Sequence, residues 1–223
     1  MKNNLERMLD TIRSEAAFCA AYTGKKSIDK RVLQAMLEVD RKAFVPEHSK
    51  SMAYDNGPLP IGYGQTISQP FIVALMTDLL DVSAESIVLE VGTGSGYQAA
   101  ILSRLVKQVY TIEKIPELAE LSMQKFKTLG YENIQARCYN GYYGWEEKAP
   151  FDAIIVTAAA PHIPQSLVDQ LKPGGRMVIP VGQHHASQEL ILVTKDKSGI
   201  TSTKSMLAVA FVPLVMEGAE ALP

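Results

Sequence analysis

The 223-residue sequence lacks the features that mark several classes of protein. Its two cysteines, Cys19 and Cys138, lie far apart in apolar surroundings, which predicts buried free thiols in a reducing compartment rather than a metal or redox pair. The net charge of −2 indicates neither a nucleic-acid partner nor an anionic-membrane surface. No signal peptide begins the chain and no apolar run is long enough to cross a membrane. We therefore expect a cytoplasmic monomer.

Metal-binding patterns and internal repeats are also missing. His184 and His185 are adjacent, so their side chains point apart, and no third ligand accompanies them; we assign no metal. The length and the hydrophobic fraction of 47% suit one domain with a substantial core. We expect a single domain over residues 1–223, with helices and a loop in 1–80, an α/β core in 81–215 and a tail in 216–223.

What the sequence does contain is centred on residues 87–97, I-V-L-E-V-G-T-G-S-G-Y. An apolar run over 87–91 predicts a strand buried on both faces, and residues 97–106 carry apolar side chains at helical spacing. Gly92, Gly94 and Gly96 stand between them. Glycine permits positive φ and close approach of a ligand to the main chain, and the first amides of a helix can hold an anion. The stretch predicts a ligand-binding strand–turn–helix unit.

The glycine turn leaves two ligands open. Gly92, Gly94 and Gly96 form G-x-G-x-G, whereas Gly94 to Ala99 forms G-x-G-x-x-A, which the dinucleotide fingerprint tolerates. Glu113, at the end of the next strand, can accept both hydroxyls of a ribose. S-adenosylmethionine and a nicotinamide dinucleotide both contain a ribose, so Glu113 does not separate them.

Strands and helices alternate over the following hundred residues. We expect strands at 87–91, 109–113, 134–138, 153–158, 176–181, 190–194 and 208–214, with helices at 97–106, 116–129 and 165–171. This order predicts a doubly wound, mostly parallel seven-stranded sheet with helices on both faces. Helices near 5–22, 27–41 and 70–80 form an N-terminal helical lobe. Ligands of such sheets bind beyond the carboxyl ends of the strands, where the glycine turn, Glu113 and residues 157–161 all lie.

Residues 54–70, Y-D-N-G-P-L-P-I-G-Y-G-Q-T-I-S-Q-P, differ from the rest. Their glycines and prolines exclude a regular helix or a central strand, and their tyrosines and isoleucines argue against a floppy linker. Long ordered loops inside a compact domain are usually functional. We therefore expect this loop to take part in the site.

Several of these segments together resemble class I S-adenosylmethionine-dependent methyltransferases. V-L-E-V-G-T-G-S-G, the acid Glu113, P-F-D-A-I-I-V-T-A-A-A-P and L-K-P-G-G-R-M-V-I-P-V-G match the motifs of that Rossmann-like class in order. Within it, L-P-I-G-Y-G-Q-T-I-S-Q-P over residues 59–70 resembles the hallmark loop of the protein-L-isoaspartate (D-aspartate) O-methyltransferases. R-K-A-F-V-P-E, G-W and A-F-V-P-L agree with that family, and the resemblance covers about 40–215.

The resemblance implies methyl transfer from S-adenosylmethionine to the free α-carboxylate of L-isoaspartyl and D-aspartyl residues in damaged proteins and peptides, which starts their repair. It implies these cofactor-binding residues: Glu90, Gly92, Thr93, Gly94, Ser95, Gly96, Glu113, Lys114, Asn140 and Gly141. The family usually has Gly-Asp-Gly where this chain has Tyr139-Asn140-Gly141. Asn140 keeps a carbonyl acceptor for the adenine amino group but lacks the charge, so a weakened S-adenosylmethionine-binding protein is one alternative.

The chemistry fits the residues of the loop. A carboxylate acceptor is ionised at neutral pH, since its pKa is near ~3.5–4, and it needs no general base. Ser68 is the candidate catalytic residue because its neutral hydroxyl can orient the carboxylate, and Thr66 and Ile67 are expected to line the same substrate pocket. Ser68 also suits the N-cap of the following helix. The other alternative, a nicotinamide-dependent oxidoreductase, leaves residues 59–70 unexplained.

Overall fold

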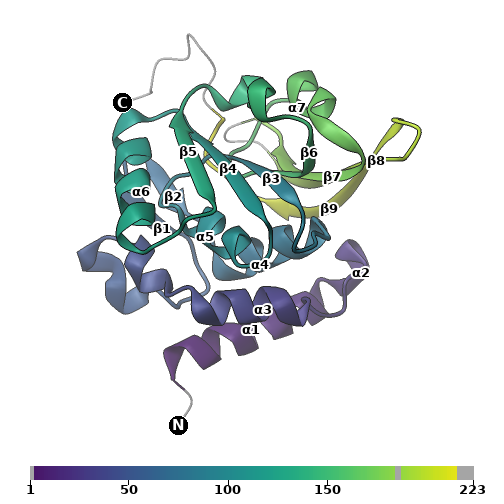
Figure 1. Ribbon diagram of the computed structural model, residues 1–223. Coiled ribbons are helices and arrows are strands. Elements are labelled where there is room, and N and C mark those ends of the chain that lie inside the picture. Colours follow the sequence, from purple (N-terminus) through teal and green to yellow (C-terminus); the bar gives the residue numbers. More distant parts are fainter. Residues whose placement is uncertain (1–2, 184–186, 215–223) are drawn as a thin grey trace.

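The computed structural model describes residues 3–183 and 187–214, and its centre is a seven-stranded sheet (Figure 1). The strand order is β5-β4-β3-β6-β7-β8-β9. The strands are β3 (Ile87–Val91), β4 (Gln108–Glu113), β5 (Ile134–Cys138), β6 (Phe151–Val156), β7 (Leu171–Val181), β8 (Gln188–Lys195) and β9 (Thr201–Val209). The first five in spatial order are parallel, and β8 pairs antiparallel with both of its neighbours, β7 and β9. The predicted mostly parallel sheet is confirmed.

The sheet is buried on both faces because its central strands are apolar on both. Val88 of β3 packs into one hydrophobic cluster, whereas its neighbour Leu89 packs into the cluster on the opposite face. Helices α4 (Pro70–Leu79), α5 (Tyr97–Ser103) and α6 (Pro116–Thr128) contribute to the first cluster. The second contains α7 (Gln165–Asp169) and Trp145, which precedes the short helix η4 (Glu146–Lys148). The helices thus flank both faces, as the sequence predicts.

The N-terminal lobe forms an outer layer. Figure 1 shows α1 (Asn4–Phe18) and α3 (Lys30–Glu38) on the side of α4 away from the sheet, and both contact α4. The apolar face of α1 is buried there, and the left-handed Gly24 ends α2 (Ala20–Thr23) at the predicted position. Two short 3-10 helices, η1 (Arg41–Phe44) and η2 (Glu47–Met52), lead from the lobe to the loop.

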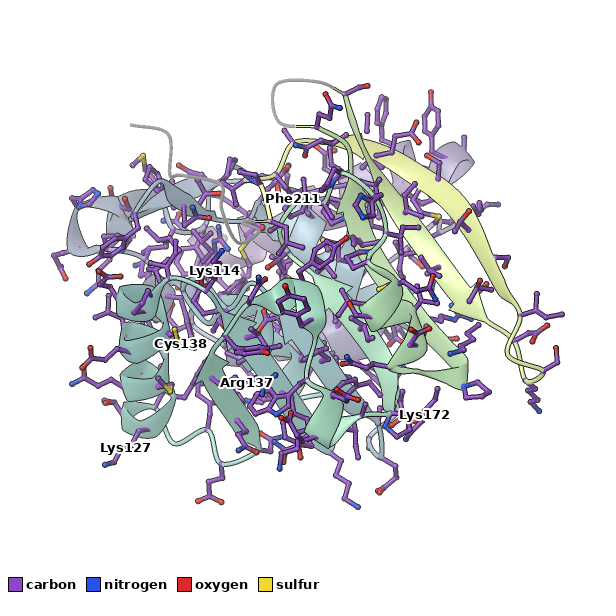
Figure 2. The ribbon with its side chains drawn as sticks, turned by 90° about the horizontal axis from the view of Figure 1, so that it is seen from above. Lys114, Lys127, Arg137, Cys138, Lys172 and Phe211 are labelled. Carbon is purple, nitrogen blue, oxygen red and sulfur yellow. The ribbon has the colours of Figure 1, made fainter. Side chains whose placement is uncertain are left out.

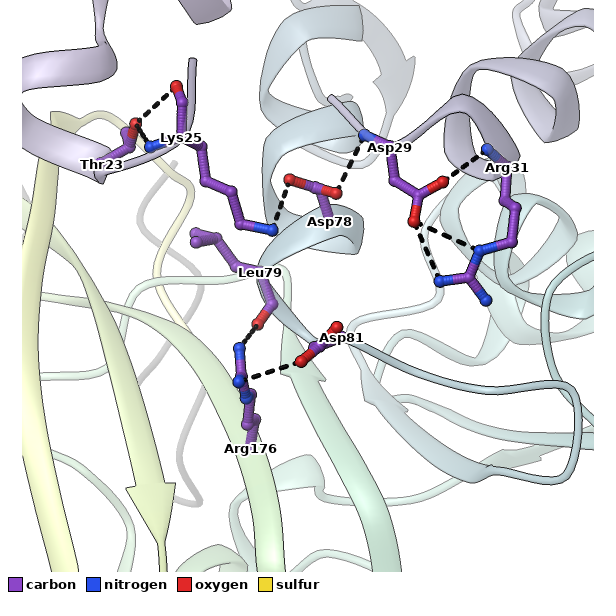
Figure 3. Close-up of polar contacts among 8 residues, drawn as sticks. All are labelled: Thr23, Lys25, Asp29, Arg31, Asp78, Leu79, Asp81 and Arg176. Atoms are coloured by element: carbon purple, nitrogen blue, oxygen red, sulfur yellow. Dashed lines mark hydrogen bonds and ion pairs between the residues drawn. The ribbon is translucent and has the colours of Figure 1, made fainter. Parts of the chain in front are cut away.

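Charged side chains attach this lobe to the end of α4 (Figure 3). The buried carboxylate of Asp78 lies 3.0 Å from the Lys25 ammonium and accepts from the backbone amide of Asp29 at 3.1 Å. Beside it, the exposed Asp81 pairs with Arg176 of β7 at 3.0 Å. The contacts join three segments, the lobe, α4 and the sheet, at one point.

The loop that the sequence predicts at 54–70 contains a small hairpin. Strands β1 (Leu59–Gly62) and β2 (Gln65–Ile67) pair antiparallel outside the main sheet. Tyr63 and Gly64, which connect them, both have positive φ, as a two-residue hairpin turn of this kind requires. Residues 54–70 therefore have a defined conformation, and the hairpin leads directly to the start of α4.

Two predictions about the later part of the chain are wrong. The seventh strand is β9 at 201–209, not 208–214, because T-S-T-K-S lies on an exposed edge strand without the apolar alternation that would reveal it. Cys138 is exposed, since it stands at the end of the edge strand β5, whereas Cys19 is buried as expected. The predicted tail at 216–223 and the pair His184 and His185 lie outside the described residues. No helix in the described part of the chain is long and apolar enough to cross a membrane.

Candidate active site

A cavity opens where β3, β4 and β6 end. In Figure 2, Phe211 and Lys114, which directly follows β4, both lie above Lys127 and Lys172. The lining comprises Gln65, Thr66, Ile67, Ser68, Val73, Val91, Gly92, Thr93, Gly94, Ser95, Tyr97, Gln98, Ile112, Glu113, Lys114, Ile115, Gly141, Thr157, Ala158, Val212, Pro213 and Leu214. One cavity therefore brings together the glycine turn, the end of β4 and the hairpin.

The glycine turn has the backbone that its residues predict. Gly92, Gly94 and Gly96 all have positive φ. A Cβ on Gly92 would lie 2.4 Å from Oγ1 of Thr157, whose hydroxyl donates to the Gly92 carbonyl at 2.6 Å. The end of β6 thus holds the turn against the sheet, and a side chain at Gly92 would break that contact.

Glu113 lies where the sequence predicts a ribose-binding acid. Its Oε2 accepts from the amide of Gly94 at 2.7 Å and its Oε1 accepts from the amide of Ile115 at 3.0 Å. Each carboxylate oxygen keeps a further lone pair, so the two oxygens can still accept from a pair of adjacent hydroxyls. The bond to Gly94 also fixes the position of the acid relative to the turn.

Glu90 lies below the cavity rather than in its lining. The side chain is 0% exposed and accepts from the hydroxyl of Thr111, which lies 2.6 Å from the hydroxyl of Thr93 in the turn. Burial raises the pKa of Glu90 to about 8, so the buried carboxyl is mainly protonated at neutral pH. Glu90 is thus connected to the glycine turn through the hydroxyls of Thr111 and Thr93, and its contact with a cofactor stays a prediction.

Two other predicted cofactor residues are absent from the lining, Gly96 and Asn140. Gly96 caps α5, and a Cβ there would lie 2.7 Å from the ring of Phe126. The Asn140 side chain accepts from the amide of Tyr142 at 3.1 Å at the edge of the site. Gly141, which follows it, does line the cavity. The contacts of Gly96 and Asn140 with a cofactor remain predictions.

A second wall comes from the hairpin, which supplies Thr66 and Ile67, and from Ser68 directly after it. The N-cap of α4 is Gln69, without a side-chain hydrogen bond, so Ser68 does not cap the helix. Among the described residues the Ser68 hydroxyl has no hydrogen-bond partner and is free to bind a ligand. The hairpin also meets the turn directly, because Cδ1 of Ile61 lies 3.3 Å from where a Cβ on Gly94 would be.

The sequence analysis did not identify part of the lining. Residues 212–214 close one side of the cavity, since Ala159 donates to the Val212 carbonyl and accepts from Leu214, both at 2.8 Å. This segment was expected to be a strand. The small residues at 158–161 were the available signal, because they indicate room for a close backbone. Tyr97 and Gln98 were also missed, since helical spacing alone marks them as core.

A doubly wound sheet, with a glycine-turn cavity at the ends of β3 and β4 and an acid on β4, is the Rossmann-like arrangement that class I S-adenosylmethionine-dependent methyltransferases share with dinucleotide-binding proteins. The chain belongs to the protein-L-isoaspartate (D-aspartate) O-methyltransferase family, whose family model matches residues 14–219.

Individual relatives and solved structures that are similar to this chain carry the name of the same family. The chain is similar to "Protein-L-isoaspartate O-methyltransferase 2" of Syntrophobacter fumaroxidans, with 57% identity over 208 residues, 93% of this chain and 84% of that protein. A solved structure named protein-L-isoaspartate O-methyltransferase has a TM-score of 0.81 at 26% identity, covering 94% of this chain and 65% of that one. Another, from Plasmodium falciparum in complex with S-adenosyl-L-homocysteine, has a TM-score of 0.79 at 28% identity, covering 96% and 99%. Of the two ligands that the glycine turn left open, the family selects S-adenosylmethionine.

Proposed function

We propose that this protein transfers a methyl group from S-adenosylmethionine to the free α-carboxylate of L-isoaspartyl and D-aspartyl residues in damaged proteins and peptides. The observation that carries the proposal is a single cavity with two unlike walls. One wall is the glycine turn with Glu113, and the other presents the unpartnered hydroxyl of Ser68. A donor and an acceptor can therefore meet inside one cavity.

The residues of the first wall fit S-adenosylmethionine. Gly92 and Gly94 have positive φ and expose backbone on the cavity side, and the two Glu113 oxygens suit the two hydroxyls of a ribose. Lys114, Ile115 and Gly141 continue this wall beyond Glu113. When bound, the cofactor supplies a methyl group activated by a positively charged sulfur.

The hairpin wall orients the acceptor. The carboxylate oxygen provides the electron pair for the new oxygen–carbon bond while the carbon–sulfur bond breaks, so no proton has to be removed. Ser68 donates its hydroxyl hydrogen to the carboxylate, and a neutral donor leaves that oxygen more nucleophilic than an ion pair would. Thr66 and Ile67 shape the pocket beside it. Alignment of this kind contributes roughly 7–11 kcal/mol to lowering a barrier.

The partners that follow are isoaspartyl-containing peptides and proteins. No nucleic acid or membrane is required, and the protein acts as a cytoplasmic monomer. The chain's balanced charge supports the first statement, and no helix among the described residues is long and apolar enough to cross a membrane.

An isoaspartyl-peptide assay with labelled S-adenosylmethionine tests the function. The wild type is expected to incorporate base-labile label into an isoaspartyl peptide and not into its aspartyl counterpart. In Ser68→Ala, loss of one hydrogen bond to a charged group is expected to lower kcat/KM about 10- to 100-fold. Affinity for S-adenosylhomocysteine, measured by calorimetry, is expected to stay within about twofold of wild type, because Ser68 lies on the other wall.

Ser51→Ala is the matched control, because Ser51 is an exposed serine outside the cavity. It is expected to leave kcat/KM unchanged. Binding of S-adenosylhomocysteine by the wild type without any methyl incorporation would indicate the alternative, a cofactor-binding protein without this activity. Unchanged turnover of Ser68→Ala would remove the role of Ser68 alone.

A further inference from the structure

Arg41, in the first turn of η1, is the largest fully buried side chain in the described part of the chain, at 0% exposed. Burial lowers the pKa of Arg41 to about 10, so the guanidinium is still charged at neutral pH. None of the ion pairs between described residues includes it. A buried cation without an acidic partner is costly, and an apolar side chain would fill the same volume at less cost.

The guanidinium joins the two ends of the segment that carries the hairpin, residues 53–68. Its Nε donates to the carbonyl of Ala53 at 2.7 Å and its Nη2 donates to the carbonyl of Ser68 at 2.8 Å. These two carbonyls belong to the first and the last residue of the segment 53–68, so the planar guanidinium holds the two ends of this segment together. Arginine can donate in two fixed directions, whereas the single ammonium of lysine cannot reproduce that fork.

The N-cap of η1 also holds the start of residues 53–68. Asp40, at the N-cap, accepts from the amide of Lys42 at 2.9 Å and from the hydroxyl of Tyr54 at 2.7 Å. Tyr54 adjoins Ala53, whose carbonyl Arg41 binds. Two successive residues, Ala53 and Tyr54, thus attach the start of residues 53–68 to η1 and its N-cap.

The same guanidinium reaches the cofactor wall. Its Cζ lies 5.0 Å from the ring centroid of Tyr97, which is the first residue of α5, follows the glycine turn and lines the cavity. Arg41 therefore contacts one residue of each wall, Ser68 and Tyr97, without lining the cavity itself. Its position links the two halves of the site.

We propose that Arg41 is a positioning residue for methyl transfer. It holds Ser68 in position in the cavity by joining the two ends of residues 53–68. The inference rests on the proposed function, because it assigns to Arg41 the placement of the acceptor. Arg41 acts through the Ser68 carbonyl and does not line the cavity in which the donor and the acceptor would meet.

Arg41→Lys tests the proposal, because it keeps the charge and removes the fork. We expect kcat/KM for the isoaspartyl peptide to fall at least about 10-fold, whereas the Kd of S-adenosylhomocysteine stays within about twofold. Amides of residues 59–67 are expected to exchange with solvent faster in hydrogen-exchange measurements, and those of β3 are not. Arg104→Lys is the control, since Arg104 is an exposed arginine over the ring of Tyr131, and none of these quantities should change.

Two results would overturn the proposal. One is an Arg41→Lys protein with wild-type kcat/KM. The other is a parallel loss of peptide turnover and S-adenosylhomocysteine affinity without selective exchange in the hairpin, which marks a general packing role. If the wild type itself fails to methylate, the proposed function fails. Amide hydrogen exchange of residues 59–67 in the wild type and in Arg41→Lys still decides whether Arg41 holds the ends of residues 53–68 together.

A measurement on the unmodified protein covers the case in which Arg41→Lys does not fold. In the protein with ¹⁵N-labelled arginine, the Nε–H of Arg41 is expected to be the slowest-exchanging arginine signal. It should shift when the isoaspartyl peptide is added in the presence of S-adenosylhomocysteine. The aspartyl peptide should leave it in place. An Arg41 signal that does not respond to the isoaspartyl peptide contradicts the proposal.

Discussion

At the scale of the residue, Glu90 shows how a functional segment can depend on a side chain outside the cavity. The carboxyl has no exposed surface and is joined through Thr111 to Thr93 of the glycine turn. Desolvation raises the pKa of Glu90 to about 8 from its ordinary value of 4.5. Between these values the folded protein keeps a proton that the unfolded chain has lost.

The free energy of unfolding should therefore fall as the pH rises from about 5 to 8, with a contribution from Glu90 of up to about 1.4 kcal/mol per pH unit. Glu90→Gln is expected to remove this contribution, because its side chain does not titrate. Urea denaturation of both proteins across this range measures the difference. Glu132→Gln, at an exposed position, should run parallel to wild type, and a Glu90→Gln curve that also runs parallel would refute the assignment.

At the scale of the element, α4 connects the site to the N-terminal lobe. The helix starts beside Ser68, and near its other end the buried Asp78 binds Lys25 and the amide of Asp29 (Figure 3). Asp78→Asn keeps an acceptor for the amide and loses the ion pair. We expect it to lower the free energy of unfolding by roughly 1–3 kcal/mol, less than a fully buried pair because Lys25 is partly exposed.

Hydrogen exchange locates the effect, with faster exchange expected in α1 and α3 than in the sheet. Asp81→Asn is a matched control, since Asp81 pairs with Arg176 at the surface and its positive φ suits asparagine equally. Its cost should be below about 1 kcal/mol. Equal costs for the two variants would show that the burial of Asp78 does not matter.

At the scale of the molecule, the lobe and the sheet share a hydrophobic core. Met8 and Ile12 of α1 belong to the same cluster as Val88 and Val178 of the sheet. We therefore expect a single domain that unfolds in one transition. Far-ultraviolet circular dichroism and the fluorescence of Trp145, which lies in the cluster on the other face, should give the same midpoint.

S-adenosylhomocysteine should raise that midpoint, because it binds the folded state. For a monomer, the midpoint should not depend on protein concentration. Two separate midpoints, one for each probe, would instead indicate that the lobe or one face of the sheet unfolds independently.

Much of this architecture can be read from local pattern. The glycine turn, the ends of β3 and β5 and the start of α5 agree with the predicted boundaries, because apolar period, glycine and proline act within a few residues. The resemblance to the family was also visible in the sequence, since its hallmark loop at residues 59–70 is one continuous stretch. Short-range rules were sufficient wherever neighbouring residues set the conformation.

Other features depend on which distant segments meet, and no local pattern contains that information. The inward direction of Glu90, the exposure of Cys138 and the edge position of β9 follow from the place of each strand in the sheet. The contact of Arg41 with Ser68 and the closure of the cavity by residues 212–214 join parts of the chain that are remote in sequence. Burial and side-chain partners are properties of the packed molecule, so the arrangement of the site appears only once the chain is folded.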